Sequence, residues 1–381
     1  LGDGSTWGTW RIKNEELHKY NPFNDYSDKP EYHSSNVDDA STAPSVHNPI
    51  GRHRIIYLNG PGGCGKTTRV LEHFRCVKDD FIVLAPTHRL VRDFKERGFS
   101  ADTYHNYFRY SGGDWSASRM GNKKIHSVIM FDEVCIMPIS VLKMFLDYLK
   151  TKNVVVIFCG DHDQPPPFGG ISPHCWLRLQ VDYYEEMTVD RRSLDDELVR
   201  LKSSIRCTSN ENQATVFRRT VIDSTFDEFL DRWSPADFVV ASRRNTRDSI
   251  TAELFELHKS KFPDELVPLQ YRPVDTRLQN ILVDIPGNSE QQKLVLNDIV
   301  WVKLSDVEHA LNMKNSPWRL GYACTIHSTQ GLTITDTIIW IIDDFISWDN
   351  LVYLAVSRVR RINQLKRVIL DYWVEVEYHQ E

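Results

Sequence analysis

The sequence predicts an α/β protein built on two parallel sheets. Four short apolar runs without polar alternation, at 54–58, 81–85, 127–131 and 153–159, are separated by helix-like segments. This pattern is typical of buried strands in a parallel sheet that helices cover on both faces. A second set of apolar runs follows at 237–242, 336–342 and 365–370. We therefore expect two sheet domains, at 51–185 and 186–381.

Three segments do not fit the sheet pattern. Residues 1–50 have little apolar periodicity and predict a partly ordered arm or the tail of an upstream domain. The segment 109–124 is rich in Gly, Ser and basic residues and interrupts the first domain. The segment 271–304 alternates apolar and polar residues around a turn at 286–288 and predicts a small antiparallel unit in the second domain.

Composition narrows the class of protein. The chain has 381 residues, of which 41% are hydrophobic and 26% charged, and no apolar run reaches the roughly 20 residues that cross a bilayer. The seven cysteines are scattered and form no Cys-x-x-Cys pair. We therefore expect an intracellular protein in a reducing compartment, without a membrane partner or a zinc ribbon. A net charge of −6 still permits nucleic-acid binding through a local basic groove.

The stretch "YLNGPGGCGKTTRV" (57–70) follows an apolar run and opens a helix-like segment. It matches G-x-x-x-x-G-K-[ST], in which backbone N–H groups and a helix N-terminus surround phosphate oxygens. We expect Lys66 to reach the β- and γ-phosphates of ATP and the Thr67 hydroxyl to ligate Mg²⁺. The candidate nucleotide-binding residues here are Gly60, Gly62, Gly63, Gly65, Lys66, Thr67 and Thr68.

Two further strand ends carry groups suited to phosphoryl transfer. In "IMFDEV" (129–134), we expect Asp132 to hold the Mg²⁺ hydration shell and Glu133 to align and deprotonate the attacking water. In "GDHDQPPP" (160–167), the Gln164 amide both donates and accepts, which suits a sensor of the γ-phosphate. An acidic helix N-terminus and a structural turn are the alternative interpretations of these two motifs.

Together with four further motifs, the order of these motifs along the chain is specific enough to indicate a protein family. They are "APTHRL" (85–90), "DTYHNYF" (102–108), "ACTIHSTQGLTI" (323–334) and "YLAVSRVRR" (353–361). Over about residues 52–370 the chain resembles superfamily 1 helicases, and among them the RecD and Pif types. The resemblance implies two RecA-like P-loop NTPase lobes with small insertions, ATP in the cleft between the lobes, and a single strand across the top.

The resemblance also implies a set of site residues in the second lobe. Arg358 falls on an arginine that contacts the γ-phosphate, and Arg192, with Arg191 in reserve, on a second arginine finger. A planar guanidinium supplied across a cleft neutralises charge on the phosphoryl group and couples hydrolysis to lobe closure. Gln330 and Gly331 face either ATP or the strand. The implied catalytic set is Lys66, Glu133, Gln164, Arg192 and Arg358.

Strand-binding residues follow from the same resemblance. Hydroxyl, imidazole and aromatic groups in these motifs hold the sugar-phosphate chain without reading sequence, or stack on bases. The candidates are Thr87, Thr103, Tyr104, His105, Phe168, Thr325 and His327. For Tyr104, as for Tyr107 and Phe108, ordinary core packing is the alternative. The 109–124 segment, with Trp115, stands where these helicases carry a strand-separating wedge, and a surface loop is the alternative.

The implied function is an ATP-driven helicase that unwinds DNA with 5′ to 3′ polarity. A viral-type RNA helicase and a nucleic-acid-binding NTPase switch without unwinding activity are the alternatives. We expect a monomeric motor, or part of a larger replication protein, of a virus or mobile element or of genome maintenance. The sequence departs from the family pattern at the residue that recognises adenine. Many relatives carry a glutamine for this purpose ahead of the phosphate loop, but no glutamine occurs in residues 1–58. We therefore expect the protein to accept several nucleoside triphosphates.

Overall fold

The computed structural model describes most of the chain from residue 54 to residue 370. The described ranges are 54–76, 78–111, 115–121, 123–167, 170–208, 210–273, 281–288, 291–344 and 350–370, without the side chains of residues 78, 210, 211 and 281. The predicted arm at 1–50 and Phe168 lie outside these ranges. Within them, no helix combines the length and the apolar character needed to cross a membrane.

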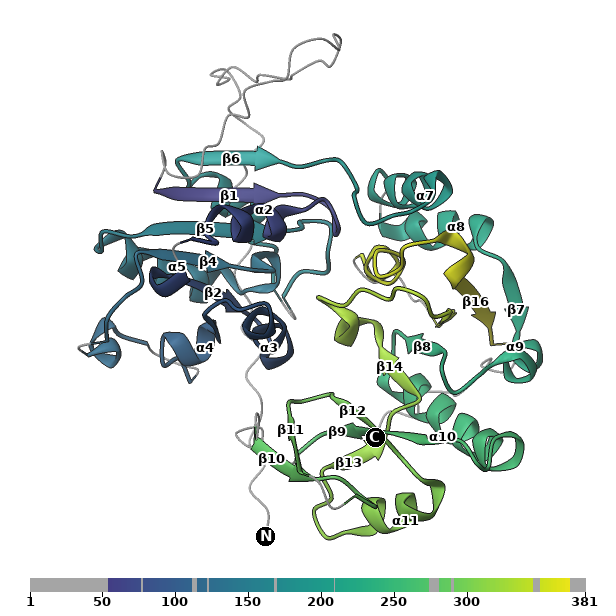
Figure 1. The fold of residues 1–381 in the computed structure, drawn as a ribbon. Helices are drawn as coiled ribbons and strands as arrows, with labels where there is room; N and C mark the ends of the chain where they lie inside the picture. Colours follow the sequence, from purple (N-terminus) through teal and green to yellow (C-terminus); the bar gives the residue numbers. More distant parts are fainter. Residues whose placement is uncertain are drawn as a thin grey trace, which may run out of the picture. The chain divides into compact units, whose positions relative to one another are not determined.

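The first part of the chain forms a six-stranded parallel sheet of order β3-β2-β4-β5-β1-β6 (Figure 1). Its strands are β1 (Ile55–Asn59), β2 (Phe81–Ala85), β3 (Ala101–Thr103), β4 (Val128–Phe131), β5 (Val155–Gly160) and β6 (Tyr183–Glu186). The helices between them are α2 (Lys66–His73), α3 (His88–Glu96), α4 (Tyr104–Tyr107), α5 (Ile139–Lys150) and α6 (His174–Arg178). The four apolar runs predicted as strands in this region are confirmed.

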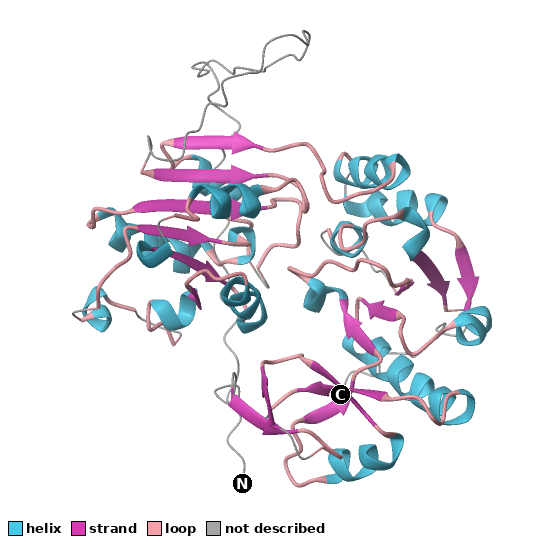
Figure 2. Ribbon diagram, in the orientation of Figure 1, coloured by secondary structure: helices cyan, strands magenta, loops and turns pink. Residues whose placement is uncertain are grey.

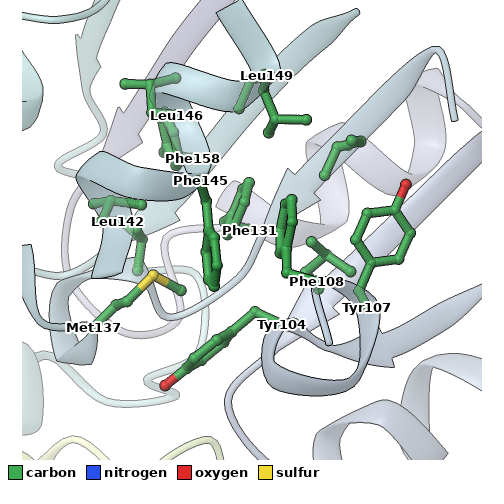
Figure 3. Close-up of a cluster of buried hydrophobic side chains, with 14 of the residues drawn as sticks. Tyr104, Tyr107, Phe108, Phe131, Met137, Leu142, Phe145, Leu146, Leu149 and Phe158 are labelled. Atoms are coloured by element: carbon green, nitrogen blue, oxygen red, sulfur yellow. The ribbon is translucent and has the colours of Figure 1, made fainter. Parts of the chain in front are cut away.

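Side chains of each strand alternate between two cores, one on each face of this sheet. On one face Tyr57, Phe131 and Phe158 pack with α4 and α5 in a cluster that Figure 3 shows in close-up. On the other face Leu58 and Ile157 join the cluster that contains residues of α2 and α3. Because helices cover both faces of the sheet, both sides of each strand are buried, and the strand sequences are continuous apolar runs.

The second part of the chain forms a five-stranded parallel sheet of order β14-β8-β15-β16-β7. Its strands are β7 (Asp223–Thr225), β8 (Phe238–Ala241), β14 (Ala323–Thr325), β15 (Ile339–Ile342) and β16 (Leu365–Ile369). The accompanying helices, cyan in Figure 2, are α7 (Asp196–Arg206), α8 (Asn210–Thr220), α9 (Phe226–Arg232), α10 (Arg244–Lys261) and α12 (Leu351–Val356). Two parallel sheets with their helices confirm the predicted α/β class.

A small antiparallel unit, which we call the β unit, interrupts the second sheet between β8 and β14. Its three-stranded sheet has the order β12-β9-β13, and β10 pairs with β11 beside it. Its elements are β9 (Val267–Tyr271), β10 (Ile281–Asp284), β11 (Gln291–Leu294), β12 (Ile299–Val302), α11 (Leu304–Asn312) and β13 (Trp318–Leu320). The predicted turn at 286–288 is present, because Asn288 N donates to Ile285 O. The predicted range 271–304 was too narrow, since β9 and β13 lie outside or at its edge.

The segment predicted as a wedge, 109–124, contains one short helical turn, Ala117–Met120, within its described residues. Trp115 is half-buried, and its indole Nε1 donates to Phe108 O at 2.6 Å. Its ring also packs edge-on against Phe145. Trp115 therefore anchors the segment to the core of the first sheet.

Candidate functional site

The glycine-rich loop connects β1 to α2 and follows a path that only glycine tolerates. Gly60 and Gly63 have φ angles of 144° and 93°, in the region that L-residues rarely adopt. A Cβ at Gly60 would lie 2.0 Å from Met187 O, and one at Gly63 would lie 2.3 Å from Arg192 Cβ. The segment that follows β6 therefore lies in direct contact with the loop.

Lys66 begins α2, as predicted, and its ammonium group lies over the loop. Its Nζ donates to the carbonyl oxygens of Gly60 at 2.6 Å and Pro61 at 2.9 Å. Burial opposes the charge of Lys66, but nearby acidic groups, Asp161 foremost, outweigh it and raise the pKa of the lysine. Lys66 thus remains a cation at the site where phosphates are expected.

Thr67 and Asp132 form an oxygen pair beside the loop. Thr67 Oγ1 donates to Asp132 Oδ1 at 2.8 Å, and burial together with Glu133 raises the pKa of Asp132 to about 7. Hydroxyl and carboxylate oxygens are the ligand type that Mg²⁺ prefers. A carboxylate whose charge is disfavoured by desolvation and by a neighbouring like charge is suited to a divalent cation, so these residues fit the expected metal.

Three side chains form a chain of hydrogen bonds from the first sheet to the second part of the molecule. Gln164, which is buried, donates from Nε2 to Glu133 Oε2 at 3.2 Å and accepts from Gln330 Nε2 at 3.3 Å. Glu133 has a left-handed φ of 52°. Gln330 therefore faces Gln164, and the structure brings together three residues that the sequence placed in separate motifs.

The adjoining Gly331 approaches α3 closely. Its φ is 76°, and a Cβ there would lie 2.8 Å from Leu90 Cδ2. Gly331 thus serves as a close contact between the segment after β14 and the first part of the chain.

Two arginines from the later part of the chain converge on the glycine-rich loop. The position of a Cβ on Gly62 would be 3.4 Å from Arg358 Nη2 and 3.5 Å from Arg192 Nη1. Arg192 Nη1 also donates to Ser357 O at 3.0 Å. Arg358 is 1% exposed, and burial and Arg192 lower its pKa to about 10. Neither arginine makes an ion pair within the described part of the chain.

Arg191, the reserve candidate, lies on the other side of the same loop. Its backbone N donates to Gly63 O at 3.0 Å, and its Cδ is 3.7 Å from the position of a Cβ on Gly65. Since the Arg192 guanidinium lies beside that of Arg358, the geometry favours Arg192 as the partner of Arg358.

The sequence interpretation missed a carboxylate that joins the loop to α12. Asp161, 1% exposed, accepts from Gly62 N at 2.9 Å and from the Tyr353 hydroxyl at 2.8 Å. The "GDHDQ" motif contained the signal, since Asp161 follows β5 directly at the edge where Asp132 follows β4. The role of Tyr353 could not be predicted from the sequence, because an aromatic residue in an apolar helix normally belongs to the hydrophobic core.

A second missed group holds the loop that carries Arg192. Asp190 accepts from Arg192 N at 2.8 Å and from Lys202 Nζ at 3.1 Å. Lys202 also donates to Ser193 Oγ at 2.8 Å. Lys202 lies on α7 and is 4% exposed. A lysine in a charged helix normally indicates a solvated face, so the burial of Lys202 could not be predicted from the sequence.

Of the candidate strand-binding residues near the first sheet, some are exposed and others are buried. Thr87 and Thr103 cap helices: their hydroxyls accept from Leu90 N at 3.3 Å and Asn106 N at 3.2 Å. Thr87 is exposed, whereas Thr103 is buried. His105 is exposed and its ring lies 4.2 Å from that of Tyr104, measured between centroids.

The placement of Tyr104 requires a correction. Tyr104 is 8% exposed, and its ring packs toward Phe145 within the core shown in Figure 3. Tyr107 and Phe108 are buried in the same cluster. The core-packing alternative therefore applies to these three aromatic residues, since a buried ring offers no face to a base.

The later candidates, Thr325 and His327, lie at the end of β14 and in the helical turn that follows it, Ile326–Thr329. Thr325 is half-buried and its hydroxyl lies 3.4 Å from Ser328 Oγ, while His327 is exposed. Thr68 is exposed on the first turn of α2. These positions are compatible with ligand contact.

Three buried free cysteines surround the glycine-rich loop and its strands. They are Cys64 in the loop, Cys159 in β5 and Cys135 after β4. Burial raises the pKa of Cys135 to about 12 and that of Cys159 well above its usual value. Cys76, Cys175 and Cys207 are exposed. In the described ranges, no group of three or more His, Cys, Asp or Glu side chains is arranged to hold a metal ion.

Fold and site together place a glycine-rich phosphate-binding loop beside arginines that follow the first sheet in the chain. A family model described as an AAA domain matches residues 45–170, which contain the loop, Asp132, Glu133 and Gln164. The ATP-dependent DNA helicase PIF3 of Trypanosoma brucei brucei (strain 927/4 GUTat10.1) is 45% identical over 49 residues. That match covers 13% of this chain and 6% of the relative.

Solved Pif1 helicases share the fold over most of the chain. A Pif1 helicase of Candida albicans aligns with a TM-score of 0.55 and 13% identity, covering 83% of this chain and 91% of that one. A Bacteroides Pif1 bound to ssDNA aligns with a TM-score of 0.53 and 15% identity, covering 84% and 89%. The two-lobe RecA-like fold expected from the resemblance to Pif-type superfamily 1 helicases is confirmed.

Proposed function

We propose that this chain is an ATP-dependent helicase that moves along single-stranded DNA and unwinds duplexes with 5′ to 3′ polarity. The observation that carries the proposal is the convergence of Arg192 and Arg358 on Gly62. Both arginines come from beyond the first sheet, so the nucleotide loop is completed by residues of the second lobe. An NTPase that needed no motion between lobes would gain nothing from this arrangement.

The residues of the site divide the work of hydrolysis. The loop N–H groups and Lys66 hold the β- and γ-phosphates, and Glu133 orients the attacking water. Bound between Thr67 and Asp132, Mg²⁺ would supply further neutralisation of the phosphate charge. Arg192 and Arg358 stabilise the charge that develops on the γ-phosphoryl oxygens, because their forked guanidiniums match that geometry.

Two links transmit a change at the nucleotide to the second lobe. One is the chain Glu133–Gln164–Gln330, and the other joins Gly62 to Tyr353 through Asp161. A change in phosphate occupancy at Gly62 or Glu133 alters these hydrogen bonds. Because the partners Gln330 and Tyr353 adjoin the strand-binding candidates and Arg358, hydrolysis and movement along the strand are coupled.

The choice of DNA is supported by the relatives, and the polarity by the resemblance of the motifs to RecD- and Pif-type helicases. The short match is to an ATP-dependent DNA helicase, and a structural neighbour is a Pif1 bound to ssDNA. The matched segment spans 6% of the PIF3 sequence.

The test compares unwinding of 5′-tailed and 3′-tailed duplexes of DNA and RNA. We expect ATP-dependent unwinding of the 5′-tailed DNA alone, and none with Lys66→Ala. Arg358→Ala is expected to lower kcat for ATP on the order of a thousandfold, the effect of removing an arginine finger. Unwinding by the Lys66→Ala protein would contradict the mechanism.

The ATPase assay separates the remaining alternatives. Stimulation by single-stranded RNA and not DNA would replace the DNA assignment with an RNA helicase. Equal ATP hydrolysis with and without nucleic acid would replace the motor with an NTPase switch.

A further inference from the structure

The outer face of the β12-β9-β13 sheet carries exposed apolar side chains. Along β12, Val300 and Val302 point into the core of the β unit, while Ile299 and Trp301 are 39% and 48% exposed. The register places Trp301 opposite Pro268 on the same face. The Trp301 indole lies outside the hydrophobic core of the β unit, so its exposed part is available to contact a ligand.

This face lines a hollow that other parts of the chain close. The hollow has a volume of about 210 Å³ and is bounded on one side by Ile299, Trp301 and Pro268. It is also lined by Arg89 of α3, by Asp237 before β8, and by Cys324 and Ser328, which lie close to Thr325 in the chain. Arg89 lies two residues after Thr87, so the hollow lies beside strand-binding candidates from both sheets.

One arginine supplies positive charge at the hollow. Arg89 lines it, and the Asp237 carboxylate, which also lines it, accepts hydrogen bonds from Trp340 Nε1 and Ser234 N. Arg247 does not line the hollow and forms an ion pair with Asp248. Arg89 is therefore the guanidinium that a phosphate in the hollow would meet.

We propose that Trp301 stacks on a base of bound single-stranded nucleic acid, with a neighbouring phosphate facing Arg89. The proposal rests on the proposed helicase function and adds Trp301, which lies outside the motifs that carry that function. An aromatic side chain beside an arginine matches the two repeating chemical features of a single strand, the base and the phosphate. A folded protein partner would offer no such repeat.

Equilibrium binding of a fluorescently labelled oligonucleotide tests the two contacts separately. Trp301→Ala is expected to weaken binding about tenfold, the order expected for one lost stacked base, without changing the salt dependence. Trp301→Phe is expected to restore most of the affinity. Arg89→Gln is expected to weaken binding and to reduce the slope of log K against log salt by about 0.7, the value for one phosphate of a single strand.

An oligonucleotide with abasic positions provides the decisive comparison. If Trp301 stacks on a base, removing the bases from the strand lowers the affinity of the wild-type protein. The same removal is expected to lower the affinity of Trp301→Ala by a factor that is about tenfold smaller. DNA and RNA strands are compared in parallel to identify the source of the base. Leu282→Ala is the matched control, since Leu282 is 63% exposed in the same β unit and does not line the hollow.

Wild-type binding must be observed for the stacking role to hold. Wild-type binding that is equal to that of Trp301→Ala on normal and abasic strands overturns the proposal and leaves the helicase assignment intact. Failure of the wild-type protein to bind any single strand overturns both. ATPase activity measured without nucleic acid is expected to be unchanged by Trp301→Ala, which checks that the nucleotide site is folded.

Discussion

The buried Lys202 illustrates how a single residue outside the motifs can set the geometry of the site. It joins Asp190 and Ser193, which fix the backbone of Arg192. The charged groups that act on it are Asp190, Arg192 and Arg358. Lys202 is therefore a positioning residue, because it acts on the nucleotide only through Arg192.

Lys202 predicts an alkaline limit to ATP hydrolysis. Burial lowers its pKa from 10.5 to about 8, so above pH 8 it loses its proton and its ion pair with Asp190. We expect kcat to fall through about pH 8 with little change in the KM for ATP. Lys202→Arg keeps the charge and is expected to abolish the fall, whereas Lys202→Met lowers kcat at every pH. A pH profile of Lys202→Arg identical to wild type would contradict this role.

The contribution of Lys202 to folding stability changes with pH in the opposite direction to its effect on kcat. Between pH 8 and 10.5 the unfolded chain holds the Lys202 proton and the folded chain does not. Stability from this group therefore rises with pH in the window where activity falls. Thermal melts across this window separate a loss of positioning from unfolding.

At the residue scale, the sequence predicted the groups that stand at strand ends and within spaced motifs. Lys66, Asp132 and Gln164 lie together in the structure because parallel strands bring their carboxyl ends to one edge. Arg192 and Arg358, which only the family resemblance implied, reach the loop from the segments before α7 and after α12. Asp190 and Lys202 could not be predicted, since their roles depend on burial by a loop and a helix that only the tertiary structure specifies.

At the level of elements, an ion pair joins α3 to the β unit. Arg92 donates from Nη1 and Nη2 to the two carboxylate oxygens of Asp298, at 2.5 and 2.8 Å. Asp298 also accepts from Val295 N at 2.8 Å, and its side chain is 8% exposed. The pair fixes the β unit against the same helix that carries Arg89.

Removing this pair is expected to loosen the β unit locally. In Arg92→Ala the buried Asp298 carboxylate keeps only its backbone partner, which costs about 1–3 kcal/mol. Hydrogen–deuterium exchange is expected to accelerate in peptides covering 295–302 and to stay unchanged in β4. Lys95→Ala, an exposed change on the same helix, serves as the control. Equal exchange in both variants would argue against the link.

The elements that the sequence failed to predict share a physical feature. β3, β7, β13 and β14 have three residues each, too few for a hydrophobic period to emerge. β9 and β13 pair with partners many residues away, and such pairing is not visible in local patterns. The long apolar runs of β1, β2, β5, β15 and β16 were predictable because both of their faces are buried.

At the scale of the whole molecule, the described residues form two sets of hydrophobic cores that share no residue. The cores of the first sheet draw on residues 55–184, and those of the second on residues 198–370. A chain organised in this way is expected to depart from two-state unfolding, because each set can lose its packing separately.

A core substitution in the first sheet tests this independence. Leu142 on α5 is fully buried (Figure 3), and Leu142→Ala is expected to destabilise its own lobe by about 2–5 kcal/mol. Native-state hydrogen exchange in denaturant should show the first sheet opening earlier while β15 and β16 keep their wild-type protection. A matching loss of protection in both sheets would indicate a single cooperative unit.

The distribution of thiols makes the molecule convenient for spectroscopy. Cys64, Cys135 and Cys159 are buried, and for Cys135 and Cys159 burial also raises the pKa, whereas Cys76, Cys175 and Cys207 are exposed. Because thiolates are the reactive species, a maleimide dye is expected to attach to the exposed three first. Cys175 belongs to α6 and Cys207 follows α7, one in each lobe. With Cys76 replaced by serine, a donor and acceptor on this pair would report lobe movement during each cycle of hydrolysis, without a label entering the nucleotide loop.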